Sequence, residues 1–235
     1  MLIIWFVVGI PIVTLDKIYI KPDEENIYFL DCTRISETDE IVSRKSESLD
    51  LQIERLSKVF KNKKILLADD VVFSGNVLKN IINRFNKLGI ETIGIIASIC
   101  SNEAYNYFNN NLKYGISVNY LMSDDVIDQV CERDFYFGIA GSGIMINNNG
   151  RLFKAPYFKP YGNPNERASI PLEYEKTFSK GCLERSAYLW EEIDKIRNGE
   201  TIIGELPEEI IYTNKEDGVV KTLKKEMKRI WKNCK

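Results

Sequence analysis

The stretch from Lys64 to Gly89 (KILLADDVVFSGNVLKNIINRFNKLG) constrains the fold more than any other part of this chain. It begins with the apolar run Ile65–Ala68, which has the length and composition of a strand buried on both faces. An acidic pair follows where that strand should end, and the turn Phe73–Asn76 then opens a helix that Gly89 would terminate. The apolar residues of this helix recur at helical spacing: Val77, Leu78, Ile81, Ile82, Phe85 and Leu88.

This order of strand, acidic pair, turn and helix predicts a binding site for a sugar phosphate. The first backbone N–H groups of a helix are unpaired, and the helix dipole favours an anion there. Gly75 has no Cβ, so the backbone can approach a phosphate closely. Asp69 and Asp70 can accept hydrogen bonds from vicinal hydroxyls or hold a divalent cation through water. In an open α/β sheet such a site lies at the carboxyl ends of the strands, near a topological switch point.

Strand-like and helix-like segments alternate through the first 150 residues, which predicts an α/β fold. The strands are expected at residues 1–8, 27–30, 65–68, 92–99, 116–122 and 135–140, and a hairpin turn at 147–150. Alternation at this spacing implies right-handed crossovers and a mainly parallel sheet with helices on both faces. We therefore expect an α/β core over residues 1–150.

At Ile65–Val77 the sequence resembles the type I phosphoribosyltransferase family, whose signature is a hydrophobic strand, two acidic residues, a hydrophobic pair and small hydroxyl or glycine residues entering a helix. The resemblance implies the phosphoribosyltransferase-like fold and a site for phosphoribosyl pyrophosphate or a nucleotide 5′-phosphate. It also implies transfer of the ribose-phosphate to a nitrogen nucleophile, with Mg²⁺ as cofactor. Such an enzyme is a glycosyltransferase of nucleotide metabolism.

The resemblance also implies roles for individual residues. Asp69 and Asp70 would contact the ribose hydroxyls, act in catalysis and hold Mg²⁺ through water. The loop that would wrap the 5′-phosphate comprises Val72, Phe73, Ser74, Gly75, Asn76 and Val77. Phe73 and Val77 stand where the family usually has Thr or another small or polar residue. Enzymes of the family that act on 6-oxopurines carry an acidic residue at the place of Phe73, which argues against that substrate.

Further contacts follow from the same resemblance. Arg34 could reach a phosphate or pyrophosphate, or form an ordinary surface pair, and Gly141 and Ser142 could approach the base and pyrophosphate or simply end a strand. The family's pyrophosphate loop follows an early strand, and the stretch expected to correspond to it here, Gly9–Val13, is apolar. Residues 35–48 are either a mobile loop or the flap that often precedes the family's signature strand.

Other interpretations of the acidic pair remain open. A buried strand can end in Asp-Asp and turn into a helix without binding anything. The apolar Gly9–Val13 stretch favours a non-catalytic regulatory protein of the same fold that binds phosphoribosyl pyrophosphate or a nucleotide. An Asp-dependent phosphatase expects Asp-x-Asp rather than the adjacent Asp69-Asp70, so we place it third.

Composition excludes several classes of chemistry. The chain of 235 residues contains no histidine, which removes Ser-His-Asp and Cys-His catalysis and most zinc enzymes. Its five cysteines are scattered without paired spacing, which indicates reduced thiols and a cytoplasmic protein. The apolar start is too short to span a bilayer, so we expect no membrane partner. A net charge of −2 gives no reason to expect nucleic acid.

Residues 151–235 form an α-rich elaboration that is expected to cap the core or to make a homodimer. Four prolines between positions 151 and 171, together with the aromatic residues Tyr157, Phe158 and Tyr161, predict a packed loop without a regular element. A long helix is expected over 171–198, ended by Gly199, and a basic amphipathic helix over 218–235. A solvated face is the main interpretation of that last helix, and a nucleic-acid or membrane contact the minor one.

Overall fold

The computed structural model describes residues 9–15, 25–35, 38, 40–44, 47–60, 63–126, 132–141, 143–207, 210 and 214–232. The strand expected at residues 1–8 lies outside this range. The chain divides into two compact units: the first comprises Met1–Arg34 and Glu40–Gln129, and the second Ile35–Asp39 and Val130–Lys235. This division lies near residue 130, whereas the expected boundary at 150 falls in the turn of a β-hairpin of the second unit.

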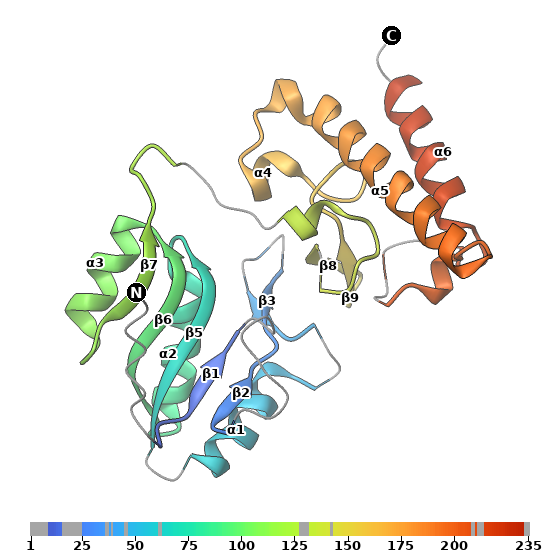
Figure 1. The fold of residues 1–235 in the computed structure, drawn as a ribbon. Helices are drawn as coiled ribbons and strands as arrows, with labels where there is room; N and C mark the ends of the chain where they lie inside the picture. Colours follow the sequence, from blue (N-terminus) through green and yellow to red (C-terminus); the bar gives the residue numbers. More distant parts are fainter. Residues whose placement is uncertain are drawn as a thin grey trace. The chain divides into compact units, whose positions relative to one another are not determined.

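The first unit is built on a parallel sheet of five strands in the order β2-β1-β5-β6-β7 (Figure 1). Its strands are β1 (Ile12–Thr14), β2 (Ile27–Phe29), β5 (Lys64–Val72), β6 (Glu91–Cys100) and β7 (Ile116–Leu121). Every neighbouring pair is parallel, which confirms the expected α/β class and parallel sheet. A short antiparallel hairpin, β3 (Thr33–Arg34) with β4 (Ile41–Val42), lies between β2 and the first helix in sequence.

Three helices connect the later strands: α1 (Leu49–Val59), α2 (Asn76–Lys87) and α3 (Asn102–Asn111). Their crossovers, from β2 to β5, β5 to β6 and β6 to β7, all step in the same direction across the sheet. Right-handed crossovers therefore place the three helices on one face. This differs from the expected helices on both faces, as far as the described residues show. The connection from β1 to β2 crosses the sheet in the opposite direction, and most of it lies outside the described residues.

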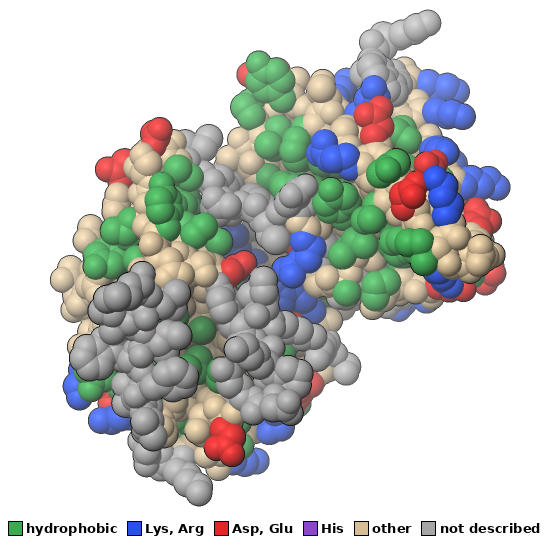
Figure 2. Space-filling view, in the orientation of Figure 1, with side chains coloured by type: hydrophobic (Ala, Val, Ile, Leu, Met, Phe, Trp, Pro, Cys, Tyr) green, Lys and Arg blue, Asp and Glu red, His purple; other side chains and the backbone are tan. Residues whose placement is uncertain are grey.

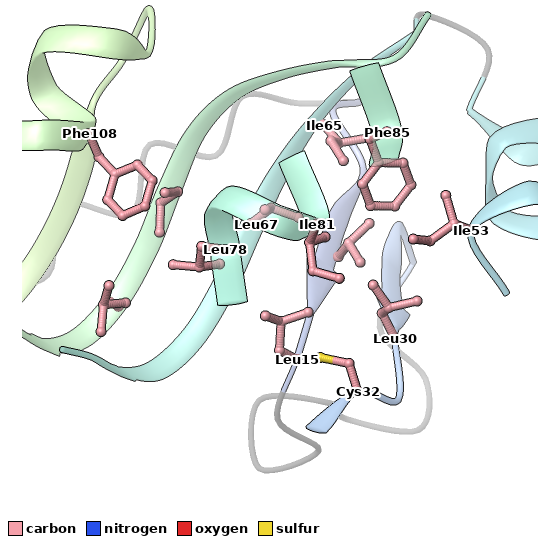
Figure 3. Packing of buried hydrophobic residues seen from close by; sticks show 14 of the residues in the cluster. Leu15, Leu30, Cys32, Ile53, Ile65, Leu67, Leu78, Ile81, Phe85 and Phe108 are labelled. Atoms are coloured by element: carbon pink, nitrogen blue, oxygen red, sulfur yellow. The ribbon is translucent and has the colours of Figure 1, made fainter. Parts of the chain in front are cut away.

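The core of the first unit lies between this helix layer and the sheet. Figure 3 shows Leu67 of β5 with Leu78 and Ile81 of α2, and Phe108 of α3 beside them. Phe85 is fully buried and its ring lies 6.2 Å from that of Phe60, which follows α1. The predicted apolar stripe of α2 is thus confirmed as its inward face, except that Leu88 is exposed.

The second unit combines the antiparallel hairpin β8 (Ile144–Asn148) and β9 (Arg151–Ala155) with helices α4 (Pro164–Ala168), α5 (Glu175–Arg197) and α6 (Val219–Lys232). It also contains the short 3₁₀ turns η2 (Glu132–Phe135), η3 (Leu172–Tyr174) and η4 (Ile203–Glu205). The predicted hairpin turn at 147–150 and the two C-terminal helices are confirmed. The segment 151–171 was expected to lack regular structure, and that prediction is wrong, because β9 and α4 lie within it.

The predicted strand at 135–140 is also wrong. Its first residue ends η2, and the chain then turns. The backbone N–H of Phe137 donates to Ser186 Oγ at 3.1 Å, and the indole N–H of Trp190 donates to the Phe137 carbonyl at 2.7 Å. Side chains of α5 therefore form hydrogen bonds with the buried backbone N–H and C=O groups of Phe137. In a sheet, a neighbouring strand would form these bonds.

Candidate functional site

The acidic pair lies at the switch point of the sheet, where β1 and β5 are neighbours. From β1 the chain moves outward to β2 and then returns to the other side of β1 to form β5. Pairing with β1 ends at Ala68, whose carbonyl accepts from Leu15 N–H at 2.9 Å, whereas pairing with β6 continues to Val72. Asp69 and Asp70 are therefore the first residues of β5 beyond the end of β1, which is where ligands bind in open α/β sheets.

The two carboxylates lie on opposite faces of the sheet, because successive side chains of a strand alternate. Asp69 shares the face of Leu67, which packs under the helices, and Asp70 shares the face of Ala68. Both side chains are partly exposed. Asp69 Oδ1 accepts from the N–H of Asp70 at 3.0 Å, and Asp70 Oδ1 accepts from the N–H of Val71 at 2.7 Å. The end of β5 thus presents one carboxylate on each face of the sheet.

Asp69 belongs to a charged group at the carboxyl ends of β2 and β5. The pKa of the Cys32 thiol is raised to about 12, mainly by burial and then by the nearby negative charges of Asp69 and Asp31, while Arg44 and Arg84 act in the opposite direction. A thiol in this environment stays protonated and is a poor nucleophile. Cys32 therefore contributes packing rather than chemistry beside the acidic pair.

The turn after β5 requires a glycine. Gly75 has φ of 70°, in the left-handed region, and is the N-cap of α2. A Cβ at this position would lie 2.8 Å from a carbon of the Phe108 ring. Ser48 and Ser101 cap α1 and α3 with their side chains, but no side chain caps α2. The start of α2 therefore has the uncapped backbone N–H groups that favour an anion.

Two residues that the sequence did not single out hold this turn in place. Ser101 Oγ donates to the Phe73 carbonyl at 2.6 Å, and Ser101 N–H donates to the Val72 carbonyl at 3.0 Å. Lys79 Nζ donates to the Ser74 carbonyl at 3.1 Å and lies 4.2 Å from the centre of the Tyr107 ring. The only sequence signal for Ser101 was its place between a strand and a helix, which suits an N-cap.

The loop Val72–Val77 otherwise follows the prediction in its local structure. Val72 ends β5, residues Phe73–Gly75 form the turn, and Asn76 begins α2. Ser74 Oγ accepts weakly from Asn76 N–H at 3.4 Å, and the Phe73 side chain is exposed. The turn, the acidic pair and the helix start thus form one continuous candidate site in the first unit.

The hairpin β3–β4 is fixed at its base by a buried carboxylate. Asp31 is 4% exposed, and its oxygens accept from Ser43 Oγ at 3.0 Å, Arg44 N–H at 2.9 Å and the Arg44 guanidinium at 3.2 Å. Gln52 of α1 accepts from Asp31 N–H at 3.0 Å. The partner of Asp31 is thus Arg44, while Arg34 is an exposed residue of β3.

The other residues predicted to contact pyrophosphate or the base are not placed beside the acidic pair by the described structure. Gly9–Pro11 precede β1 and Ile12–Val13 lie within it, so this stretch is at the amino end of β1 rather than after it. The expectation that Gly9–Val13 corresponds to a pyrophosphate loop is therefore wrong. A loop after β1 would begin at Leu15, and residues 16–24 lie outside the described range. Gly141 belongs to the second unit, and Ser142 is not described.

Comparison of the chain with protein-family models, curated proteins and solved structures found no match. In the part of the chain that the structure describes, no group of three or more Cys, Asp or Glu side chains is arranged to hold a metal ion. Nor does any described helix combine the length and apolar character that crossing a membrane requires. The site's geometry therefore carries the functional argument alone.

Proposed function

We propose that the chain binds a phosphorylated ribose at the end of β5 and the start of α2, as phosphoribosyl pyrophosphate or a nucleotide 5′-phosphate. One observation carries this proposal: Asp69 and Asp70 extend past the end of β1 at the switch point, and Gly75, five residues after Asp70, is the left-handed N-cap of the next helix. The uncapped N–H groups suit a phosphate, and the carboxylates suit sugar hydroxyls.

As an enzyme, the protein would transfer the ribose-phosphate to a nitrogen nucleophile. The bond between C1 of the ribose and the pyrophosphate oxygen breaks, a bond from nitrogen to C1 forms, and the nitrogen loses its proton to solvent. The carboxylates of Asp69 and Asp70 would stabilise the positive charge that develops on the sugar. Because Asp69 and Asp70 lie on opposite faces of the sheet, a hydrated Mg²⁺ would be held mainly by pyrophosphate with one carboxylate at most, and would neutralise the leaving group.

A binding protein without turnover is the second candidate. Phe73 and Val77 supply no hydroxyl donors where the resembling family usually has them, so phosphate contacts there come from the backbone. The apolar Gly9–Val13 stretch no longer separates the two candidates, because it lies at the opposite end of β1 from the acidic pair.

Calorimetry with phosphoribosyl pyrophosphate, ribose 5-phosphate and nucleoside monophosphates, with and without Mg²⁺, tests the binding proposal. We expect Asp69→Asn and Asp70→Asn each to weaken binding by about ten- to a hundredfold, because each removes a charged hydrogen-bond acceptor. Asp50→Asn, at an exposed carboxylate of α1, is the matched control and should bind normally. Equal binding by wild type and the double variant would refute the site.

Release of pyrophosphate with a panel of nitrogen bases then separates enzyme from binding protein. Steady release that depends on a base indicates transfer. Tight binding of phosphoribosyl pyrophosphate without release indicates the second candidate. The same Asp69 and Asp70 variants serve in both measurements, so a defect in binding is distinguished from a defect in turnover.

A further inference from the structure

The exposed face of α6 carries only one sign of charge. Among the side chains described between positions 221 and 232, the exposed ones are all basic: Lys221, Lys224, Lys225, Lys228, Arg229 and Lys232. Figure 2 shows Lys and Arg side chains gathered in this region, at the upper right of the molecule. The opposite face of α6 is buried in the second unit through Val219 and Leu223, both fully covered.

Four of these side chains form a straight line with no acidic partner. Lys221, Lys225, Lys228 and Lys232 are spaced by four, three and four residues, which places them along one side of a helix over about 16 Å. None of the four forms an ion pair or hydrogen bond with any described residue. We call these four residues the lysine row.

Two further cations flank the lysine row and are already neutralised. Lys224 pairs with Glu191 of α5 at 2.5 Å, and Arg229 pairs with Glu226 at 3.3 Å. Glu226 itself is 5% exposed, so it adds no negative charge to the surface. The row is therefore an uncompensated strip of four positive charges, although the whole chain has a net charge of −2.

The neighbouring helix α5 shows what an ordinary solvated face looks like in this protein. Its Lys180 pairs with Glu184 at 3.0 Å and its Lys195 with Glu192 at 2.6 Å, so opposite charges alternate along it. Mixed charge of this kind is sufficient for solubility. The lysine row has no such alternating acidic residues. Its positive charge therefore suits a negatively charged partner.

We propose that the lysine row binds the phosphodiester backbone of a nucleic acid without reading its sequence. Duplex DNA carries one phosphate per strand for about every 3.4 Å of its axis, so the row matches the axial length of about five base pairs. A basic stripe along a helix is the electrostatic footprint of this kind of binding. This proposal is independent of the ribose-phosphate site in the first unit.

Two other polyanionic partners fit the surface less well. A helix that binds a lipid surface lays an apolar face into it, but the apolar face of α6 is occupied by the core of the second unit. The centres of protein interfaces are enriched in aromatic residues and depleted in lysine, whereas the exposed side chains that the structure describes on α6 are lysine and arginine alone.

Fluorescence anisotropy with the full chain and labelled DNA and RNA, single-stranded and duplex, tests the proposal. With four contacts the logarithm of the duplex affinity should fall with the logarithm of salt concentration with a slope of about −3.6, or about a hundredfold between 50 and 200 mM salt. The variant K221Q/K225Q/K228Q/K232Q should lose at least about tenfold in affinity and nearly all of the salt dependence. Its circular dichroism should match wild type, because all four side chains are exposed.

The matched control changes the same net charge at four exposed lysines of the first unit: Lys58, Lys63, Lys87 and Lys113. This control should bind DNA and RNA as wild type does. Equal weakening of both variants would mean that total charge, not the row, governs binding, and would overturn the proposal. Absence of binding by wild type, or binding to phosphatidylserine-containing vesicles but not to nucleic acid, would also overturn it.

Discussion

The hydroxyl oxygen of Ser101 lies 2.6 Å from the carbonyl oxygen of Phe73, so the N-cap of α3 is also the anchor of the turn after β5. The same hydroxyl accepts from Ala104 N–H at 3.1 Å. One side chain therefore serves both the helix and the candidate phosphate loop.

Ser101→Ala should destabilise the protein and loosen the turn. We expect a loss of about 1–2 kcal/mol in the free energy of unfolding, because a cap and a turn contact disappear together. Ribose 5-phosphate binding should weaken as well. Ser48→Ala removes the cap of α1, which is remote from the turn in sequence, and should cost about 1 kcal/mol without affecting binding. Urea unfolding and calorimetry measure both effects, and equal binding by the two variants would contradict the role of Ser101.

Gly75→Ala should be more damaging than Gly89→Ala, although both glycines have similar positive φ values of 70° and 72°. A Cβ at Gly89 meets nothing within 4 Å, so only backbone strain of about 1 kcal/mol is expected. A Cβ at Gly75 also approaches Phe108 to 2.8 Å, which should add about 1–2 kcal/mol. Thermal unfolding of the two variants compares them directly. Similar losses would mean that the Phe108 ring moves aside freely.

Asp31→Asn should destabilise the first unit far more than Glu47→Gln, although the two ion pairs have similar lengths of 3.2 and 3.1 Å. Asp31 is buried and holds Ser43 and Arg44, so its loss should cost about 2–3 kcal/mol. Glu47 and Arg55 are exposed, and breaking their pair should change stability by less than about 0.5 kcal/mol. Equilibrium unfolding in urea checks the difference, and equal effects would contradict a structural role for Asp31.

Stability should fall at alkaline pH partly because of Cys32. The folded state raises the pKa of this thiol from 9.0 to about 12, so its contribution is fully present below pH 9 and is lost as the pH rises toward 12. One such thiol changes the free energy of unfolding by about 1.4 kcal/mol per pH unit in that window. Cys32→Ala should remove this slope relative to wild type. Burial raises the pKa of Cys182 to about 11, so its own slope ends near pH 11. Cys182→Ala should therefore retain the slope between pH 11 and 12, and identical slopes in all three proteins there would refute the assignment.

The local part of the fold could be predicted from the sequence because its signals are local. Strand β5 and helix α2 follow from an apolar run, a turn with glycine and helical spacing, and the β8–β9 turn follows from Asn149-Gly150. The run at 135–140 has the same apolar character as a strand. Its backbone is instead satisfied by Ser186 and Trp190, which lie far away in sequence, so no local pattern could identify it.

In the candidate site too, some features could be predicted from local sequence and others depend on tertiary packing. The positions of Asp69, Asp70 and Gly75 at a strand end and a helix start were readable from their neighbours. The contacts of Ser101 and Lys79 with the turn depend on how α3 and α2 pack, which spacing alone does not show. The opposite orientation of the two carboxylates does follow from strand alternation, once β5 is known to continue through Val72.

The bridge between Ile35 and Met145 has a consequence for synthesis of the chain on the ribosome. Ile35 is only 4% exposed, and it pairs with a residue that is made 110 positions later. Until Met145 emerges, this backbone bridge cannot form, while the strands of the first unit on both sides of Ile35 in sequence are already available to fold. A gene fragment that begins at residue 130 would encode the second unit without its segment Ile35–Asp39. Such a fragment would therefore lack part of the folded unit.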